Sequence, residues 1–270
     1  MKVNILLIVV SAVFLTAVHA GASGFGIGVH SGYGSIIYEE NTTAFGNDIT
    51  SEAVLDTVLF GISAEYTFTE PGYLFAGIVT DWAFGLEDSE TWETDGVATQ
   101  TNDLEVFGQF YDIRFGYKNT VAGLYYRIYA SGGWDGIHFR RDEFVSRGVA
   151  VSGDVTEDFS LWRIGAGAAI GYKFGKWALD GRAAYAHYPD AEVKNSSVPD
   201  VKFDTSGTCL DMGFGLAREL SANMSLYLGG TYTEIRLRES DIKQKGLLQA
   251  VFPDSSTRLT AGVVNLTYAF

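Results

Sequence analysis

The 254–270 segment constrains the fold of this chain more than any other stretch. Counting back in twos from the last residue gives an apolar and aromatic face made of Phe270, Tyr268, Leu266 and Val264. A period of two residues is the pattern of a β-strand with two different faces. An apolar face that continues to the last residue suits a strand bordered by lipid. The segment therefore predicts the closing strand of a membrane barrel, and such barrels have an even number of strands.

The first residues predict export. Lys2 gives a basic start, an apolar run of about 14 residues follows, and Val18-His19-Ala20 fits a small-x-small cleavage site. The run is shorter than the roughly 20 residues of a spanning helix, and no later stretch reaches that length. We therefore expect a secretory signal peptide at 1–20 and one exported β domain at 21–270. An N-terminal membrane anchor is the alternative.

The composition fits a β-rich exported domain. The chain has 15 Tyr, 18 Phe, 5 Trp and 32 Gly but only 4 Pro, and 47% of its residues are hydrophobic. A secreted β-sandwich and a membrane barrel both remain compatible with these numbers. Cys209 is the only cysteine, which excludes a disulfide scaffold.

Ten strand-like segments can be marked, and the connections between them alternate in length. In the clearest segment, 162–174, apolar side chains alternate with Gly, Ala, Arg and Lys. Short turns follow the even-numbered segments. Long polar stretches follow the odd-numbered ones, at 39–53, 86–103, 136–158, 188–208 and 236–256. This alternation is typical of an up-and-down antiparallel transmembrane β-barrel of about ten strands, with periplasmic termini and long extracellular loops. Eight or twelve strands are the alternatives, twelve if 136–158 contains a hairpin.

An outward apolar face leaves charged residues inside the barrel. The predicted lumen network contains five acids and five bases, namely Glu65, Asp112, Asp135, Asp180, Asp211, Arg114, Arg127, Arg163, Lys173 and Arg182. Unpaired charges in such an interior would be very unfavourable, so the equal numbers indicate pairing. Barrels of this size have interiors filled by side chains. We therefore expect a filled lumen, with a narrow pore as an alternative function.

The formal net charge of −14 is predicted to lie in the long loops. Acids cluster in 86–103 and 39–53, and such a rim would attract cationic peptides or proteins and repel nucleic acid. A merely solvated surface explains the same charges equally well. Three pairs of bases, Arg140-Arg141, Arg236 with Arg238 and Lys243 with Lys245, are candidates to contact the phosphates of lipopolysaccharide among the outer-membrane lipids.

The chain resembles the omptin family in architecture. The resemblance rests on the ten expected strands, five long loops, acidic rim and length, with local similarity at Asp81-Trp82, at 91–95 and at 266–270. It implies an outer-membrane endopeptidase that cuts next to basic residues. In that family, two aspartates face an aspartate–histidine pair across an outer cleft and activate a water.

The catalytic pattern of that family is not matched. This chain has His187-Tyr188-Pro189-Asp190 in place of an Asp-x-His spacing, and no Asp-x-Asp pair stands near Asp81 and Asp88. The weak catalytic candidates are Asp81, Asp88, His187 and Asp190. No Gly-x-Ser-x-Gly motif or Cys/His metal spacing is present, so neither a cofactor nor a metal is expected. The sequence favours a bacterial outer-membrane barrel with a role in surface interaction, adhesion or envelope structure, and a proteolytic function is the alternative.

Overall fold

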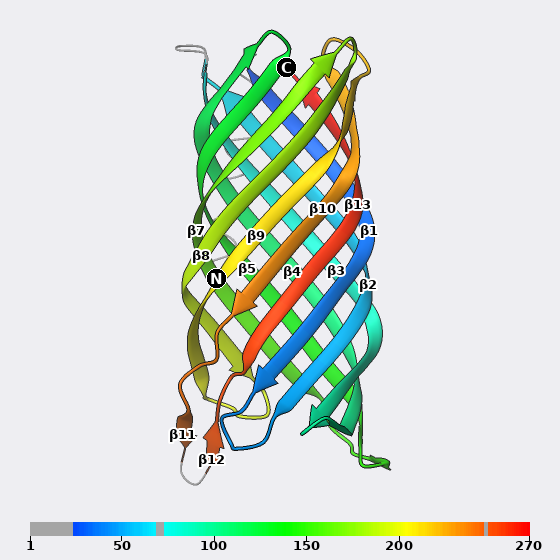
Figure 1. The fold of residues 1–270 in the computed structure, drawn as a ribbon, viewed down its shortest axis with the longest axis vertical. Helices are drawn as coiled ribbons and strands as arrows, with labels where there is room; N and C mark the ends of the chain where they lie inside the picture. The colour runs from blue at the N-terminus through cyan, green and yellow to red at the C-terminus, as the bar shows by residue number, and fades with distance from the viewer. Residues whose placement is uncertain (1–23, 69–72, 246–247) are drawn as a thin grey trace.

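The computed structural model describes residues 24–68, 73–245 and 248–270. The predicted signal peptide at 1–20 lies outside the described residues. Among them, no helix is long and apolar enough to cross a membrane. Ten antiparallel strands, strongly tilted to the barrel axis, form a closed barrel (Figure 1). The prediction of an all-β, up-and-down barrel of about ten strands is confirmed.

Each strand of the ring pairs with the next along the chain, and β13 closes it by pairing with β1. The ring consists of β1 (Phe25–Thr42), β2 (Ile49–Thr67), β3 (Leu74–Thr94), β4 (Val97–Val121), β5 (Leu124–Ser146), β7 (Val155–Phe174), β8 (Trp177–Asn195), β9 (Lys202–Glu219), β10 (Met224–Leu237) and β13 (Asp254–Ala269). The short β6 (Val149–Ala150) extends β5, and β11 (Lys243–Lys245) pairs with β12 (Leu248–Ala250). We call the end where β1 begins and β13 ends the terminus end, and the opposite one the hairpin end.

The long polar loops predicted from the sequence are mostly strand, and this prediction was wrong. β4 has 25 residues and β5 has 23, whereas a bilayer requires only about 10 per strand. The connection from β3 to β4 is the two-residue turn Asp95-Gly96, in which both residues have positive φ. Arg147-Gly148 similarly turns β5 into β6. The barrel therefore continues as a sheet far beyond a membrane's thickness.

The apolar face changes sides along each strand, and this explains the wrong prediction. On β5, Ile128 is 57% exposed on the outer face, whereas Ile137 and Phe139 are at most 3% exposed inside the barrel. The outer face of the terminus-end half forms an apolar band of which Val29, Phe60, Ile113, Phe115, Ile164, Phe214, Leu228 and Val264 are members. An apolar exterior suits lipid, and an apolar interior suits a barrel wall surrounded by water. The polar outer face of the strands in the hairpin-end half has the composition of a loop, and the sequence prediction therefore assigned these segments to loops.

The hairpin-end half of the barrel is filled by an apolar core. Its largest fully buried side chains include Tyr38, Leu55, Leu104, Phe139, Leu161 and Tyr188. Phe252 enters this core from the connection between β10 and β13 and packs against Phe159 with ring centroids 5.4 Å apart. The filled lumen that the sequence predicts is thus present in this half, whereas the other half contains a cavity.

Candidate functional site

The terminus-end half of the barrel encloses a cavity of about 630 Å³ that is lined by both charged and apolar side chains. Its lining begins at the strand ends with Phe25, Thr67 and Ala269 and continues inward between charged side chains. The apolar core closes its inner end, where the neighbouring void measures only about 20 Å³. The cavity is therefore blind, with one mouth at the terminus end.

Charged residues near the mouth are paired across strands. Glu65 on β2 accepts hydrogen bonds from Lys118 Nζ at 2.6 Å and from Arg127 Nη1 at 3.1 Å. The Tyr125 hydroxyl donates to Asp180 Oδ2 at 2.6 Å. Lys173 differs from its sequence prediction, because its half-exposed side chain lies on the rim and pairs with Glu219 at 3.0 Å.

A second group of pairs lies deeper in the lumen. Arg114 Nε lies 2.5 Å from Asp112 Oδ2, and Arg182 Nε lies 3.5 Å from Asp211 Oδ1. A further arginine, Arg163, lies between Asp112 and Asp135 at 3.7 and 3.5 Å. Except for Lys173, every residue of the predicted lumen network lines the cavity. Alternation along the strands placed these side chains inside. Asp112 and Arg114 are two residues apart on β4, whereas the pairs between strands could be found only from the structure.

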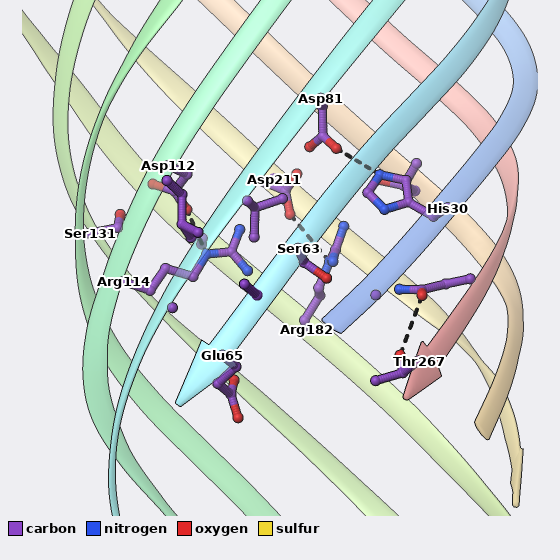
Figure 2. Close-up of a pocket in the computed structure, with 18 of the residues that line it drawn as sticks. His30, Ser63, Glu65, Asp81, Asp112, Arg114, Ser131, Arg182, Asp211 and Thr267 are labelled. Carbon is purple, nitrogen blue, oxygen red and sulfur yellow. Dashed lines mark hydrogen bonds and ion pairs between the residues drawn. The ribbon is translucent and has the colours of Figure 1, made fainter. Parts of the chain in front are cut away.

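An aspartate–histidine pair faces the cavity and was not expected from the sequence. His30 Nε2 on β1 lies 2.6 Å from Asp81 Oδ1 on β3 (Figure 2). The pair passes over Gly61 of the intervening β2. A β-carbon at Gly61 would overlap both side chains. His30 follows the alternation of the first segment, but the uniformly apolar third segment concealed the inward direction of Asp81.

The other weak catalytic candidates do not join Asp81. Asp88 and Asp190 are exposed, and His187 projects from the outer face with Nδ1 2.8 Å from the Gly207 carbonyl oxygen. These four residues therefore do not form the cleft that the omptin resemblance implies. Among the described residues, no group of three or more His, Cys, Asp or Glu side chains could hold a metal ion.

Arg141 forms the centre of a buried ionic cluster at the hairpin end. Its guanidinium contacts Glu90 at 2.7 Å, Glu157 at 3.2 Å and Glu40 at 3.6 Å, and all four side chains are at most 4% exposed. The Tyr38 hydroxyl donates to Glu40 at 2.5 Å. The sequence predicts that these acids lie in solvated loops and that Arg141 lies beside Arg140 on the surface. Both placements were wrong, because the alternation of an extended strand turns Arg141 inward and leaves Arg140 outside.

Three carboxylates around one guanidinium favour keeping a proton on the cluster. The cluster lies outside the apolar band, since the adjacent Glu39 pairs with Arg258 on the polar part of the outer face. Burial, only partly offset by the positive charge of Arg141, raises the pKa of Glu40 to about 8. The nearby Glu157 and Glu90 add to this effect because their negative charges oppose ionisation of Glu40.

Acids gather on the outer face of β3, β4 and β5 beyond the apolar band. We call this group the acidic patch, and it consists of Glu87, Asp103, Glu105, Asp142 and Glu143. Partial desolvation and the charges of Asp103, Glu105, Asp142 and Glu143 raise the pKa of Glu87. The predicted surface bases are mostly paired: Arg140 with Asp142 at 2.8 Å, Arg236 with Glu234 at 2.7 Å and Lys243 with Asp204 at 3.0 Å.

Comparison with solved structures places the fold among bacterial outer-membrane barrels. The outer-membrane protease OmpT from Escherichia coli is similar with a TM-score of 0.67 at 9% identity, over 92% of this chain and 97% of that one. The translocator domain of the autotransporter NalP from Neisseria meningitidis gives a TM-score of 0.39 at 14% identity, over 97% and 95% of the two chains. Neisserial surface protein A gives 0.34 at 13% identity, over 92% and 98%.

No protein-family model matches the sequence, and the search of curated proteins found no match either. At such low identity, the likeness to the protease extends to the fold and not to its chemistry. The chain thus has the fold of a bacterial outer-membrane β-barrel.

Proposed function

We propose that this barrel lies in the bacterial outer membrane, with its terminus end in the periplasm, and binds basic peptides or proteins through the acidic patch outside the cell. The apolar band supports the membrane location, because exposed Ile, Phe and Leu side chains need lipid around them. The hairpin-end half would then project from the membrane with a polar outer face. This arrangement presents the acidic patch to the medium.

The observation that carries the proposal is a repulsive contact in the sheet. Asp103 on β4 is the direct cross-strand partner of Asp142 on β5, and Glu143 follows at a bulge with a φ of 52°. Like charges directly opposite one another destabilise a sheet. Arg140 pairs with Asp142 at 2.8 Å and with Glu105 at 3.5 Å, and this single base offsets only part of the negative charge of the patch. Folding stability alone therefore does not account for the acidic patch, whereas attraction of cationic partners does.

The interior supports this proposal over the alternatives. A narrow pore needs a continuous path, and the apolar core closes the cavity at its inner end. We therefore expect no steady conductance in planar bilayers, and steady conductance would favour the pore. We also expect no cleavage of peptides next to Lys or Arg by protein reconstituted with lipopolysaccharide. Cleavage that disappears on His187→Ala would favour the protease.

The proposal is tested by the binding of fluorescent oligolysine to protein in phosphatidylcholine vesicles. One variant neutralises the acidic patch through Asp103→Asn, Glu105→Gln, Asp142→Asn and Glu143→Gln. The control removes the same charge from scattered exposed positions through Asp48→Asn, Asp154→Asn, Asp190→Asn and Asp241→Asn. We expect salt-sensitive binding that weakens about tenfold in the patch variant and about twofold at most in the control. Equal losses would show that net charge alone attracts the peptide and would refute the assignment of the patch.

A further inference from the structure

Two arginine side chains extend into the lumen cavity from different strands. Arg114 comes from β4 and Arg182 from β8, and Figure 2 shows both reaching into the space between the walls. Each is held through Nε, Arg114 by Asp112 at 2.5 Å and Arg182 by Asp211 at 3.5 Å. Within the described part of the chain, neither arginine makes a hydrogen bond through its terminal nitrogens. The two terminal nitrogens of each guanidinium, which we call its fork, therefore face the cavity as hydrogen-bond donors.

The surrounding residues fix the direction of both forks. The guanidinium of Arg114 lies over the Tyr129 ring, 5.1 Å from its centroid. The stem of Arg182 lies across Gly213 of β9, where a β-carbon would come within 2.8 Å of Arg182 Nε. The two side chains keep 21% and 41% exposure although they point into the barrel, so they are open to the water of the cavity.

The carboxylates of the cavity have partners of their own. Glu65 accepts from Lys118 and Arg127, Asp180 accepts from Tyr125, and Asp81 pairs with His30. The cavity lining has six carboxylates and five Arg or Lys side chains, so its formal charge is close to zero, and these carboxylates do not occupy the terminal nitrogens of Arg114 or Arg182. The donors of the forks are therefore still available to a ligand.

We propose that the lumen cavity is an oxyanion-binding site in which Arg114 and Arg182 hold the carboxylate or phosphate group of a small molecule. A guanidinium fork matches the two oxygens of a carboxylate or phosphate, and such charge-assisted hydrogen bonds are among the strongest in proteins. The ligand would enter through the mouth at the terminus end. The blind inner end means that the ligand is retained there and does not pass through.

The test measures binding to protein folded in an uncharged detergent. Inorganic phosphate and succinate are titrated separately by calorimetry, with chloride at equal ionic strength as the reference. We expect saturable binding of at least one of the two, and which one binds identifies phosphate or carboxylate as the preferred group. If neither binds more tightly than chloride, the proposal is wrong.

Variants then assign the binding to the forks. Arg182→Lys keeps the charge but removes the fork, and binding should weaken about tenfold or more. Arg236→Lys makes the same change on the outer face, where the guanidinium is 67% exposed, and should leave binding unchanged. Wild-type affinity in Arg182→Lys would overturn the proposal. Because Arg182 makes one 3.5 Å contact, this variant should fold even if Arg114→Lys does not. Oligolysine binding at the acidic patch should be unaffected, which separates this test from that of the proposed function.

Discussion

Replacing Arg141 with Met should destabilise the barrel by about 3–5 kcal/mol, the cost typical of leaving buried charges without their partner. Arg141 is 4% exposed and contacts Glu90, Glu157 and Glu40, which are themselves at most 4% exposed. Methionine fills much of the same volume, so the loss is mainly electrostatic. Glu40, whose pKa is raised to about 8, is uncharged at pH 5, so the loss of stability should be smaller at pH 5 than at pH 9.

The assay is urea unfolding of the protein in phosphatidylcholine vesicles, followed by tryptophan fluorescence. Arg140→Met provides the matched control, because the adjacent side chain is 47% exposed and its ion pairs lie on the outer face. Exposed pairs contribute little, so this control should change the free energy of unfolding by about 1 kcal/mol or less.

Two results would refute the reasoning about the cluster. A free energy of unfolding within about 1 kcal/mol of wild type for Arg141→Met would mean that its partners are solvated. Failure of the triple variant Arg141→Met, Glu90→Gln, Glu157→Gln to recover part of the loss would mean that something other than unpaired carboxylates causes it.

Three further changes test other parts of the structure. The pKa of Glu40 is raised to about 8 in the folded protein from about 4.3 in an unfolded chain, so folding takes up a proton between these pH values. The contribution of Glu40 to the free energy of unfolding is therefore complete below about pH 4.3 and is lost as the pH rises through 8. The urea concentration at the unfolding midpoint should therefore decrease as the pH is raised from 6 to 9, and the decrease should be smaller in Glu40→Gln. Gly61→Ala should cost about 1–3 kcal/mol because its β-carbon overlaps the His30–Asp81 pair, whereas Gly181→Ala, which meets no atom closer than 4.0 Å, should be nearly neutral in the same unfolding assay. Phe252→Ala should cost about 3 kcal/mol and speed proteolysis of the 238–253 connection, because Phe252 is 1% exposed and anchors that connection in the core; proteolysis at the wild-type rate would contradict this role.

The two halves of each strand differ in how readily they could be predicted. Between Ile128 and Trp134 on β5, the apolar outer face follows from alternation alone, because lipid selects one polarity for every strand. Beyond Gly136 the alternation persists with opposite phase, placing Ile137 and Phe139 inside. This phase shift was a usable signal for long strands. The end of the lipid-facing pattern marks the end of the apolar band and not the end of the strand, which continues to Ser146.

The candidate sites divide in the same way. Alternation placed Arg114 and Arg182 in the lumen, but the Nε contacts that aim them depend on neighbours two residues away on β4 and across the pairing of β8 with β9. His30 and Asp81 are 51 positions apart in the sequence and meet because β1, β2 and β3 are in register at Gly61.

The amino-acid sequence by itself determined the class of fold. A period of two residues with one apolar face is a local property that each strand carries independently, as the 254–270 segment shows. Only the tertiary structure decided which charges meet between strands. Closure of the ring brings the glutamates of β1, β3 and β7 around Arg141 of β5. It also places the forks of Arg114 and Arg182 in one cavity. The physical reason is that the polarity of each strand's faces depends on whether lipid, water or the core lies next to them. Which side chains meet across the lumen depends instead on the registers of all the strand pairs around the barrel.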